Sequence, residues 1–191
     1  MLAAAAQNST AVSVGCGMGN NENTTAIVEA LLKAGNCPII LDADGINCIS
    51  DNINVLKDND RPVILTPHPG EFARLLGMSV SEVQANRIDL ARSFAKDNGV
   101  VLLLKGMNTV IAAPDGRISL NPTGNNALSK AGCGDVLTGI VAGLAAQGAD
   151  PYDAAVLGAY IHGKCAEELV KKQNPASVLA SEILDSLKFI V

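Results

Sequence analysis

The residues best suited to chemistry lie between Asn121 and Gly148, where a polar, glycine-rich loop leads into an apolar helical segment. The N–H groups in the first turn of a helix have no partners within the helix, and the helix dipole favours negative charge there. Gly132 and Gly134 would let the backbone approach a bulky anion closely. The stretch is therefore typical of a loop that binds phosphate.

Asp135 does not fit simple phosphate binding, because its carboxylate stands among the N–H groups that would hold the anion. It does fit if the carboxylate accepts the proton of a hydroxyl that attacks a phosphate. In a second interpretation, Asp135 only caps the helix. The glycine-x-glycine sequence before it and the polar loop upstream favour the catalytic interpretation.

Polar residues also follow each of three expected strands. The strands cover residues 38–41, 62–65 and 100–104, and the residues that follow them are Asp42, Thr66 and Lys105. The carboxyl ends of parallel strands meet at one edge of a sheet, which is where α/β proteins bind ligands. We therefore expect these residues to face one site, with Lys105 placed to contact a phosphate or ribose.

Several of these residues also have a purely structural interpretation. Asp44 would cap the short helix that follows it, and Glu71 would stabilise a helix N-terminus. His68, flanked by two prolines, would be a rigid loop residue, and Lys105 would face solvent. Asp42 and Asp44 would point to opposite sides of a strand and so would not chelate one metal together.

The hydrophobic pattern predicts alternating strands and helices that are interrupted by one hairpin. Besides the strands above, we expect a strand at 11–14, a hairpin at 109–113 and 117–120, and helices at 24–34, 81–97, 150–172 and 180–189. A capping box at Ser81 would begin the second of these helices, which would bury Val83, Ile88, Ala91, Phe94 and Ala95. This order predicts an α/β fold with a mostly parallel central sheet and one β-hairpin.

Composition limits the classes of function. Residues 1–191 suit a single domain whose core is aliphatic, because 48% of the residues are hydrophobic but only 3% are aromatic. The net charge of −5 and the lack of a basic, aromatic stripe argue against nucleic acid. There is no membrane-spanning apolar run, and the five scattered cysteines suggest reduced thiols in a cytoplasmic protein.

Five stretches together resemble the ADP/ATP-dependent NAD(P)H-hydrate dehydratases, a branch of the ribokinase-like superfamily. They are GCGMG (15–19), LDADGIN (41–47), LTPHPGEFARLLG (65–77), LLLKGMNTVIAAPDG (102–116) and NPTGNNALSKAGCGDVLTGIVAG (121–143). The TPHPGE and AGxGD motifs, in this order, are the specific ones. The resemblance covers roughly residues 12–188 and implies a ribokinase-like three-layer αβα fold.

The resemblance implies a metabolite-repair lyase that returns hydrated NADH or NADPH (NADHX or NADPHX) to NAD(P)H. ADP or ATP would phosphorylate the ring hydroxyl, and phosphate would then be eliminated. Asp135 matches the family's base, and the N–H groups of Gly132, Cys133 and Gly134 would form the anion hole.

Further roles follow from the same resemblance. The family's nucleotide-binding positions match Lys105, Gly106, Met107, Asn108, Thr109 and Gly134. Gly17 and His68, with Asp135, match positions that contact the hydrated dinucleotide. Mg²⁺ would neutralise the phosphates through water near Glu71, without a direct protein ligand.

The sequence departs from the family pattern in three ways. Cys133 stands where Ser is usual, and NNALSKAG (125–132) replaces a run such as NPGMATAG, so Lys130 adds a cation beside the nucleotide. The family domain also begins well before Met1, so we expect an N-terminal part of the sheet to be missing. A truncated sheet would expose an edge and apolar helix faces, so the isolated chain would be unstable or would form a homo-oligomer through that surface. In many bacteria the domain follows an NAD(P)HX epimerase in one chain.

Two other functions share these motifs. A ribokinase-like kinase acting on a vitamin or sugar hydroxyl would use the same GxGD residues, although TPHPGE favours the dehydratase. A truncated nucleotide-binding module without activity is the third possibility. The intact glycine loops and Asp135 count against it.

Overall fold

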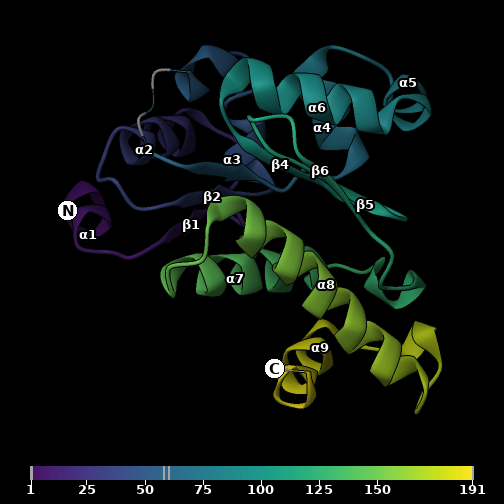
Figure 1. Cartoon of the computed structure of the whole chain (residues 1–191). Coiled ribbons are helices and arrows are strands. Elements are labelled where there is room, and N and C mark those ends of the chain that lie inside the picture. Colours follow the sequence, from purple (N-terminus) through teal and green to yellow (C-terminus); the bar gives the residue numbers. More distant parts are fainter. Residues whose placement is uncertain (1, 58, 60, 191) are drawn as a thin grey trace.

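The computed structural model describes residues 2–57, 59 and 61–190. Its centre is one six-stranded sheet in the order β1-β2-β3-β4-β5-β6 (Figure 1). The strands are β1 (Val12–Val14), β2 (Ile39–Leu41), β3 (Val63–Leu65), β4 (Val101–Leu104), β5 (Thr109–Ala112) and β6 (Ile118–Asn121). The first four run parallel, whereas β5 and β6 are antiparallel. The expected parallel sheet with one hairpin is confirmed.

Helices cover both faces of the sheet. The α-helices are α1 (Leu2–Gln7), α2 (Glu22–Leu32), α3 (Asp44–Asn47), α4 (Pro69–Leu76), α5 (Val80–Ala85), α6 (Arg87–Asn98), α7 (Cys133–Ala146), α8 (Pro151–Val170) and α9 (Ala180–Ser186). Short 3₁₀ turns lie at Ile53–Leu56, Asn126–Leu128, Pro175–Ser177 and Leu187–Phe189. Figure 1 shows α7 and α8 below the sheet and α2, α4 and α6 above it.

The strands form two aliphatic cores because their side chains alternate between the two faces. In β2, Ile39 and Leu41 pack in the core that includes Val28 of α2 and Phe72 of α4. Ile40, between them, packs in the core under α7 and α8. The expected three layers are therefore present, and an aliphatic run such as β2 is buried on both faces.

The segment 79–98 differs from the sequence-based prediction. The capping box is formed by Ser79 and Glu82, not by a box starting at Ser81. The expected single helix divides at Asn86, whose backbone is non-helical (φ −131°) and whose side-chain amide donates to the Glu82 carbonyl. The second helix, α6, begins at Arg87, and Ile88 in its first turn is 39% exposed rather than buried.

Other boundaries follow their local signals. Gly99 ends α6 in the left-handed conformation, and Asp150 caps α8 with Pro151 in its first turn. Asn21 caps α2, which begins two residues before the expected Thr24. Within the described ranges, none of the helices combines the length and apolar character that a membrane span requires.

The contact between α7 and α8 depends on Gly158, because a Cβ there would lie 2.6 Å from Cγ2 of Val141. We expect Gly158→Ala to lower the free energy of unfolding by roughly 1–3 kcal/mol through overpacking. Gly143→Ala is the matched control, because a Cβ at this exposed position of α7 would meet nothing within 4 Å. It should be neutral or stabilising by up to about 1 kcal/mol. Urea unfolding measures both variants, and equal stabilities would contradict the close packing.

Candidate functional site

The N-terminus of α7 leaves its backbone N–H groups accessible to a ligand. Its N-cap, Gly132, is left-handed (φ 86°) and supplies no side-chain cap, so the first-turn N–H groups are open to an external anion. A Cβ on Gly134 would lie 3.4 Å from Lys105 Nζ and 3.6 Å from Asp42 Oδ2. The Cys133 N–H also donates to the Lys130 carbonyl at 3.3 Å. Of the three expected anion-hole donors, this one is therefore already partly engaged.

Asp135 lies in the first turn of α7, is exposed, and is not the N-cap. The interpretation in which it merely caps the helix is therefore wrong, because Gly132 holds that position. The helix dipole still favours its negative charge. Its carboxylate is available for proton transfer at the surface of the site.

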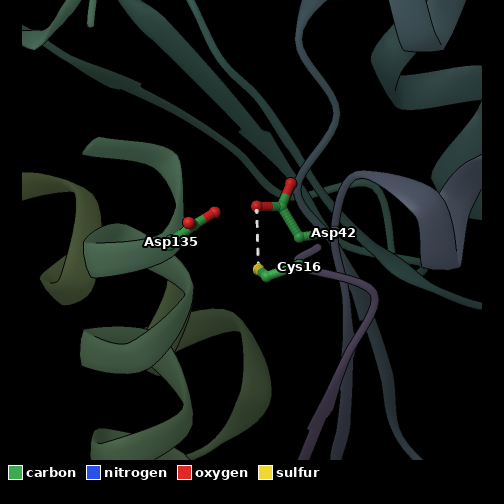
Figure 2. Close-up of side chains that lie close together, drawn as sticks. All are labelled: Cys16, Asp42 and Asp135. Carbon is green, nitrogen blue, oxygen red and sulfur yellow. Dashed lines mark hydrogen bonds between the residues drawn. The ribbon is translucent and has the colours of Figure 1, made fainter. Parts of the chain in front are cut away.

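Three side chains from separate elements converge beside this turn. Figure 2 shows Asp135 pointing from α7 toward Asp42, which follows β2, and Cys16, which follows β1. One ligand atom from each lies within 4.8 Å of the others, and Cys16 Sγ is 3.8 Å from Asp42 Oδ2. Burial, assisted by the charges of Asp42 and Asp135, raises the pKa of Cys16 to about 12. The thiol is therefore protonated near neutral pH and acts as a hydrogen-bond donor rather than a nucleophile.

Asp42 and Lys105 form a buried ion pair across the sheet. Lys105 Nζ donates to Asp42 Oδ1 at 2.8 Å, and the Thr138 hydroxyl of α7 donates to Oδ2 at 2.9 Å. The side chain of Asp42 is 2% exposed and that of Lys105 is 20% exposed. Burial alone would raise the pKa of Asp42, but Lys105 and the Thr138 hydrogen bond hold it below its ordinary value. The polar strand ends therefore do meet, as the sequence predicts.

A pocket of about 460 Å³ opens beside this pair. One wall is the loop Lys105–Thr109, and the others come from residues 121–129, the start of α7 and the middle of α8. All six residues expected to bind nucleotide line this pocket: Lys105, Gly106, Met107, Asn108, Thr109 and Gly134. The six residues span 29 positions in the sequence (134 − 105), and one cavity brings them together.

His162 of α8 also lines the pocket, although no sequence motif singles it out as a site residue. It is 6% exposed, and burial lowers its pKa to about 4, so the imidazole is neutral. Its Nε2 is buried without a hydrogen-bond partner among the described residues. Such an atom favours a pocket that a polar ligand or water completes.

His68 and Glu71 build the N-terminus of α4. His68 Nδ1 accepts from the N–H groups of Gly70 and Glu71, and Glu71 Oε2 accepts from the His68 N–H at 2.8 Å. Glu71 is buried, and its other oxygen lies 3.3 Å from His68 Nε2. The structural interpretation of Glu71 at a helix N-terminus is confirmed, and its carboxylate is committed there. The imidazole of His68 stays half exposed and available for contact.

Gly17 lies in the loop after β1, with φ 66° and open space where a Cβ would be. This loop is tied down because the Gly19 N–H donates to Asp44 Oδ2 at 2.8 Å. Asp44 is thus a loop anchor as well as the first residue of α3, whose N-cap is Ala43. Lys130, expected beside the nucleotide, instead donates to the carbonyls of Ala176 and Val178 near α9.

The three layers, the hairpin and the glycine turn at α7 together define a ribokinase-like α/β protein. The family model for NAD(P)H-hydrate dehydratase matches residues 2–188. The chain therefore belongs to the NAD(P)H-hydrate dehydratase family.

Relatives and a solved structure agree with this assignment. The chain is 43% identical over 180 residues to the bifunctional NAD(P)H-hydrate repair enzyme of Moorella thermoacetica, covering 94% of this chain and 34% of that protein. It is 41% identical over 177 residues to the ADP-dependent (S)-NAD(P)H-hydrate dehydratase of Bacillus subtilis, covering 93% of this chain and 62% of the relative. A crystal structure of the Bacillus subtilis ADP/ATP-dependent enzyme, co-crystallised with ATP/Mg²⁺, superposes with a TM-score of 0.85 at 39% identity. That match covers 97% of this chain and 67% of the solved one.

The buried ion pair yields a stability prediction. Lys105→Met leaves the Asp42 carboxylate buried without a cation, and we expect it to lower the free energy of unfolding at pH 7 by roughly 3–5 kcal/mol. In the wild type, the pKa of Asp42 is lowered, so its contribution is full above the unfolded pKa of about 3.9 and is lost as pH falls through the folded pKa. In the Lys105→Met variant, burial without a cation would raise the pKa of Asp42. Protonation of the Asp42 carboxylate at low pH would then remove the cost of burying its charge. The stability gap should therefore narrow as pH falls from 7 toward about 4.

Urea unfolding at several pH values measures this gap. Lys171→Met is the control, because its pair with Glu168 is solvent-exposed and should contribute little to stability. A gap that is small at pH 7, or that stays constant as pH falls, would contradict the assigned role of the pair.

Proposed function

We propose that this chain catalyses the nucleotide-dependent dehydration of hydrated NADH or NADPH. The observation that carries the proposal is the position of Asp135, in the first turn of α7 beside a pocket lined by every residue expected to bind nucleotide. The names of the Bacillus subtilis and Moorella thermoacetica relatives support the substrate class. ADP or ATP would be the phosphoryl donor, and Mg²⁺ its counter-ion.

The pocket fits an adenine nucleotide. Its volume of about 460 Å³ lies within the usual range for ligand pockets. The uncapped N-terminus of α7 at one end favours phosphate, and the partnerless His162 Nε2 favours a polar ligand group. The bound nucleotide would supply an electrophilic phosphoryl group, and the protein's own groups would orient and stabilise it.

Direct protein ligation of Mg²⁺ is not favoured by the cluster of Cys16, Asp42 and Asp135. The oxygens of Asp42 already accept from Lys105 and Thr138, and the Cys16 thiol is protonated. Mg²⁺ prefers oxygen ligands and keeps several waters. We infer that phosphate oxygens and water would hold it. Since Glu71 is committed to the N-terminus of α4, it offers at most a distant contact.

The chemistry assigned to the chain's residues is as follows. The Asp135 carboxylate takes the proton from the ring hydroxyl as the hydroxyl oxygen forms its bond to phosphorus. The N–H groups of Gly132, Cys133 and Gly134 stabilise the negative charge of the transferring group. Phosphate then leaves with the former hydroxyl oxygen, a ring proton is lost, and the reduced nicotinamide is restored. Gly17 and His68 would contact the hydrated dinucleotide.

The direct test mixes the protein with hydrated NADH, Mg²⁺ and either ADP or ATP, and follows the recovery of reduced-nicotinamide absorbance. We expect recovery that depends on both nucleotide and protein. A stable phosphorylated product from a panel of vitamins or sugars, without recovery, would favour the kinase alternative. Binding of ADP by calorimetry with no turnover would instead indicate a nucleotide-binding module.

A homo-oligomeric state, a cytoplasmic location and an NAD(P)HX epimerase partner stay predictions.

Asp135→Asn tests the base assignment. The amide keeps the shape of the side chain but cannot accept the hydroxyl proton, so turnover should fall by about 10²- to 10⁴-fold while ADP still binds. Asp153→Asn is the matched control, because Asp153 is an exposed first-turn carboxylate of α8 and should leave turnover unchanged. Turnover retained in the Asp135 variant would remove the carboxylate from the mechanism.

A further inference from the structure

The loop Lys105–Thr109 contains two residues with an unusual backbone conformation. Gly106 has φ 142° and Asn108 has φ 52°, so two of its residues lie in the region that favours glycine. For Asn108 this conformation costs free energy unless the surroundings enforce it. Within the loop, the Thr109 hydroxyl donates to the Gly106 carbonyl at 3.0 Å. Support from outside the loop would stabilise this conformation further.

Arg87, the first residue of α6, supplies that support. Its Nη1 donates to the Met107 carbonyl at 2.6 Å, and its Nη2 donates to the carbonyls of Leu104 at 3.1 Å and Lys105 at 3.3 Å. One planar guanidinium thus binds three carbonyls at the end of β4 and in the loop. The rigid fork of Arg suits this task, whereas the single ammonium of Lys does not.

The guanidinium also lies close to the backbone of Gly106 in this loop. A Cβ on Gly106 would lie 2.9 Å from Arg87 Nη2 and 3.2 Å from both Cζ and Nη1. The Gly106 backbone is therefore packed directly on the guanidinium. The same loop lines the pocket, whereas Arg87 does not line it.

Arg87 is not explained by the stability of its own helix. A cation in the first turn of a helix is opposed by the helix dipole. None of the ion pairs among the described residues includes Arg87, and burial lowers its pKa. Its Nε is buried without a partner in the described part of the chain. The contacts that offset these costs are the three carbonyls.

We propose that Arg87 is a positioning residue that fixes the Lys105–Thr109 loop in the shape that binds the nucleotide. By binding the carbonyls of Leu104, Lys105 and Met107, the guanidinium keeps them turned away from the pocket. Carbonyl oxygens that pointed into the pocket would repel phosphate oxygens. The inference rests on the proposed function, because it assigns the support of that same nucleotide site. Arg87 touches neither substrate nor reacting atoms, so its loss should weaken nucleotide binding more than it slows the chemical step.

The experiment compares Arg87→Met, Arg87→Lys and the wild-type protein. Kinetics give kcat and the KM for ADP and ATP, calorimetry gives the nucleotide Kd, and hydrogen exchange reports the order of residues 105–109 without ligand. For Arg87→Met we expect KM and Kd to rise about 10- to 100-fold, as for the loss of charged hydrogen bonds. The kcat should change less than about threefold, and exchange in the loop should accelerate. Arg87→Lys should restore only part of the affinity.

Arg92→Met is the matched control, because Arg92 lies on the same helix and, among the described residues, pairs only with the exposed Asp89. It should leave KM, Kd and loop exchange unchanged. A fall in kcat at unchanged KM in Arg87→Met, or unchanged loop exchange, would overturn the proposal. If Arg87→Met fails to fold, Arg87→Lys decides by the same measurements, and wild-type affinity and exchange in it would overturn the proposal. A wild-type protein that binds no nucleotide would overturn the proposed function, while loop exchange would still judge the support given by Arg87.

Discussion

The buried pair between Asp42 and Lys105 organises the functional edge of this fold. It joins the ends of β2 and β4 across the intervening β3, and the Thr138 hydroxyl connects the same carboxylate to α7. An ion pair this deep repays its desolvation only when the remaining hydrogen bonds are also made. The requirement to satisfy Asp42 therefore holds the N-terminal part of α7 against the sheet at one position. The hydrogen bond between Thr138 and Asp42 thereby positions Gly134 and Asp135, which lie on the same helix.

Next to this pair, the backbone of the loop after β1 closely approaches the turn after β2. A Cβ on Gly15 would lie 1.9 Å from the Asp42 carbonyl oxygen and 2.5 Å from the Gly45 nitrogen, and the φ of Gly15 is 126°. No other residue fits both that space and that conformation. The glycine loop after β1 thus serves first to pack β1 against the turn after β2. It thereby brings Cys16 beside Asp42, so the packing of one loop also builds one side of the site.

The sequence predicts the parts of this structure that depend on local physics. Alternating aliphatic runs gave the strands, and caps such as Asp150 and Gly99 placed helix ends within a few residues. The hydrophobic pattern did not predict the helix break at Asn86, because a side-chain amide that binds one backbone carbonyl leaves no periodic signal in the sequence. Asp42 and Lys105 are 63 residues apart, and Asp42 and Thr138 are 96 apart, so no spacing rule links them. The rule that strand ends share an edge brought these residues to one site but could not identify their partners.

The same arrangement explains how a carboxylate can act next to phosphate. Lys105 neutralises Asp42, and the Cys16 thiol remains protonated because burial and its two carboxylate neighbours raise its pKa. The charge of Asp135 is therefore the only uncompensated one in this cluster of described side chains. The first turn of α7 stabilises that charge, and in the proposed mechanism the adjoining N–H groups would hold the anion. A second free carboxylate would repel the phosphoryl donor. The pairing of Asp42 with Lys105 would therefore make the proposed base and the proposed anion site compatible within one turn of helix.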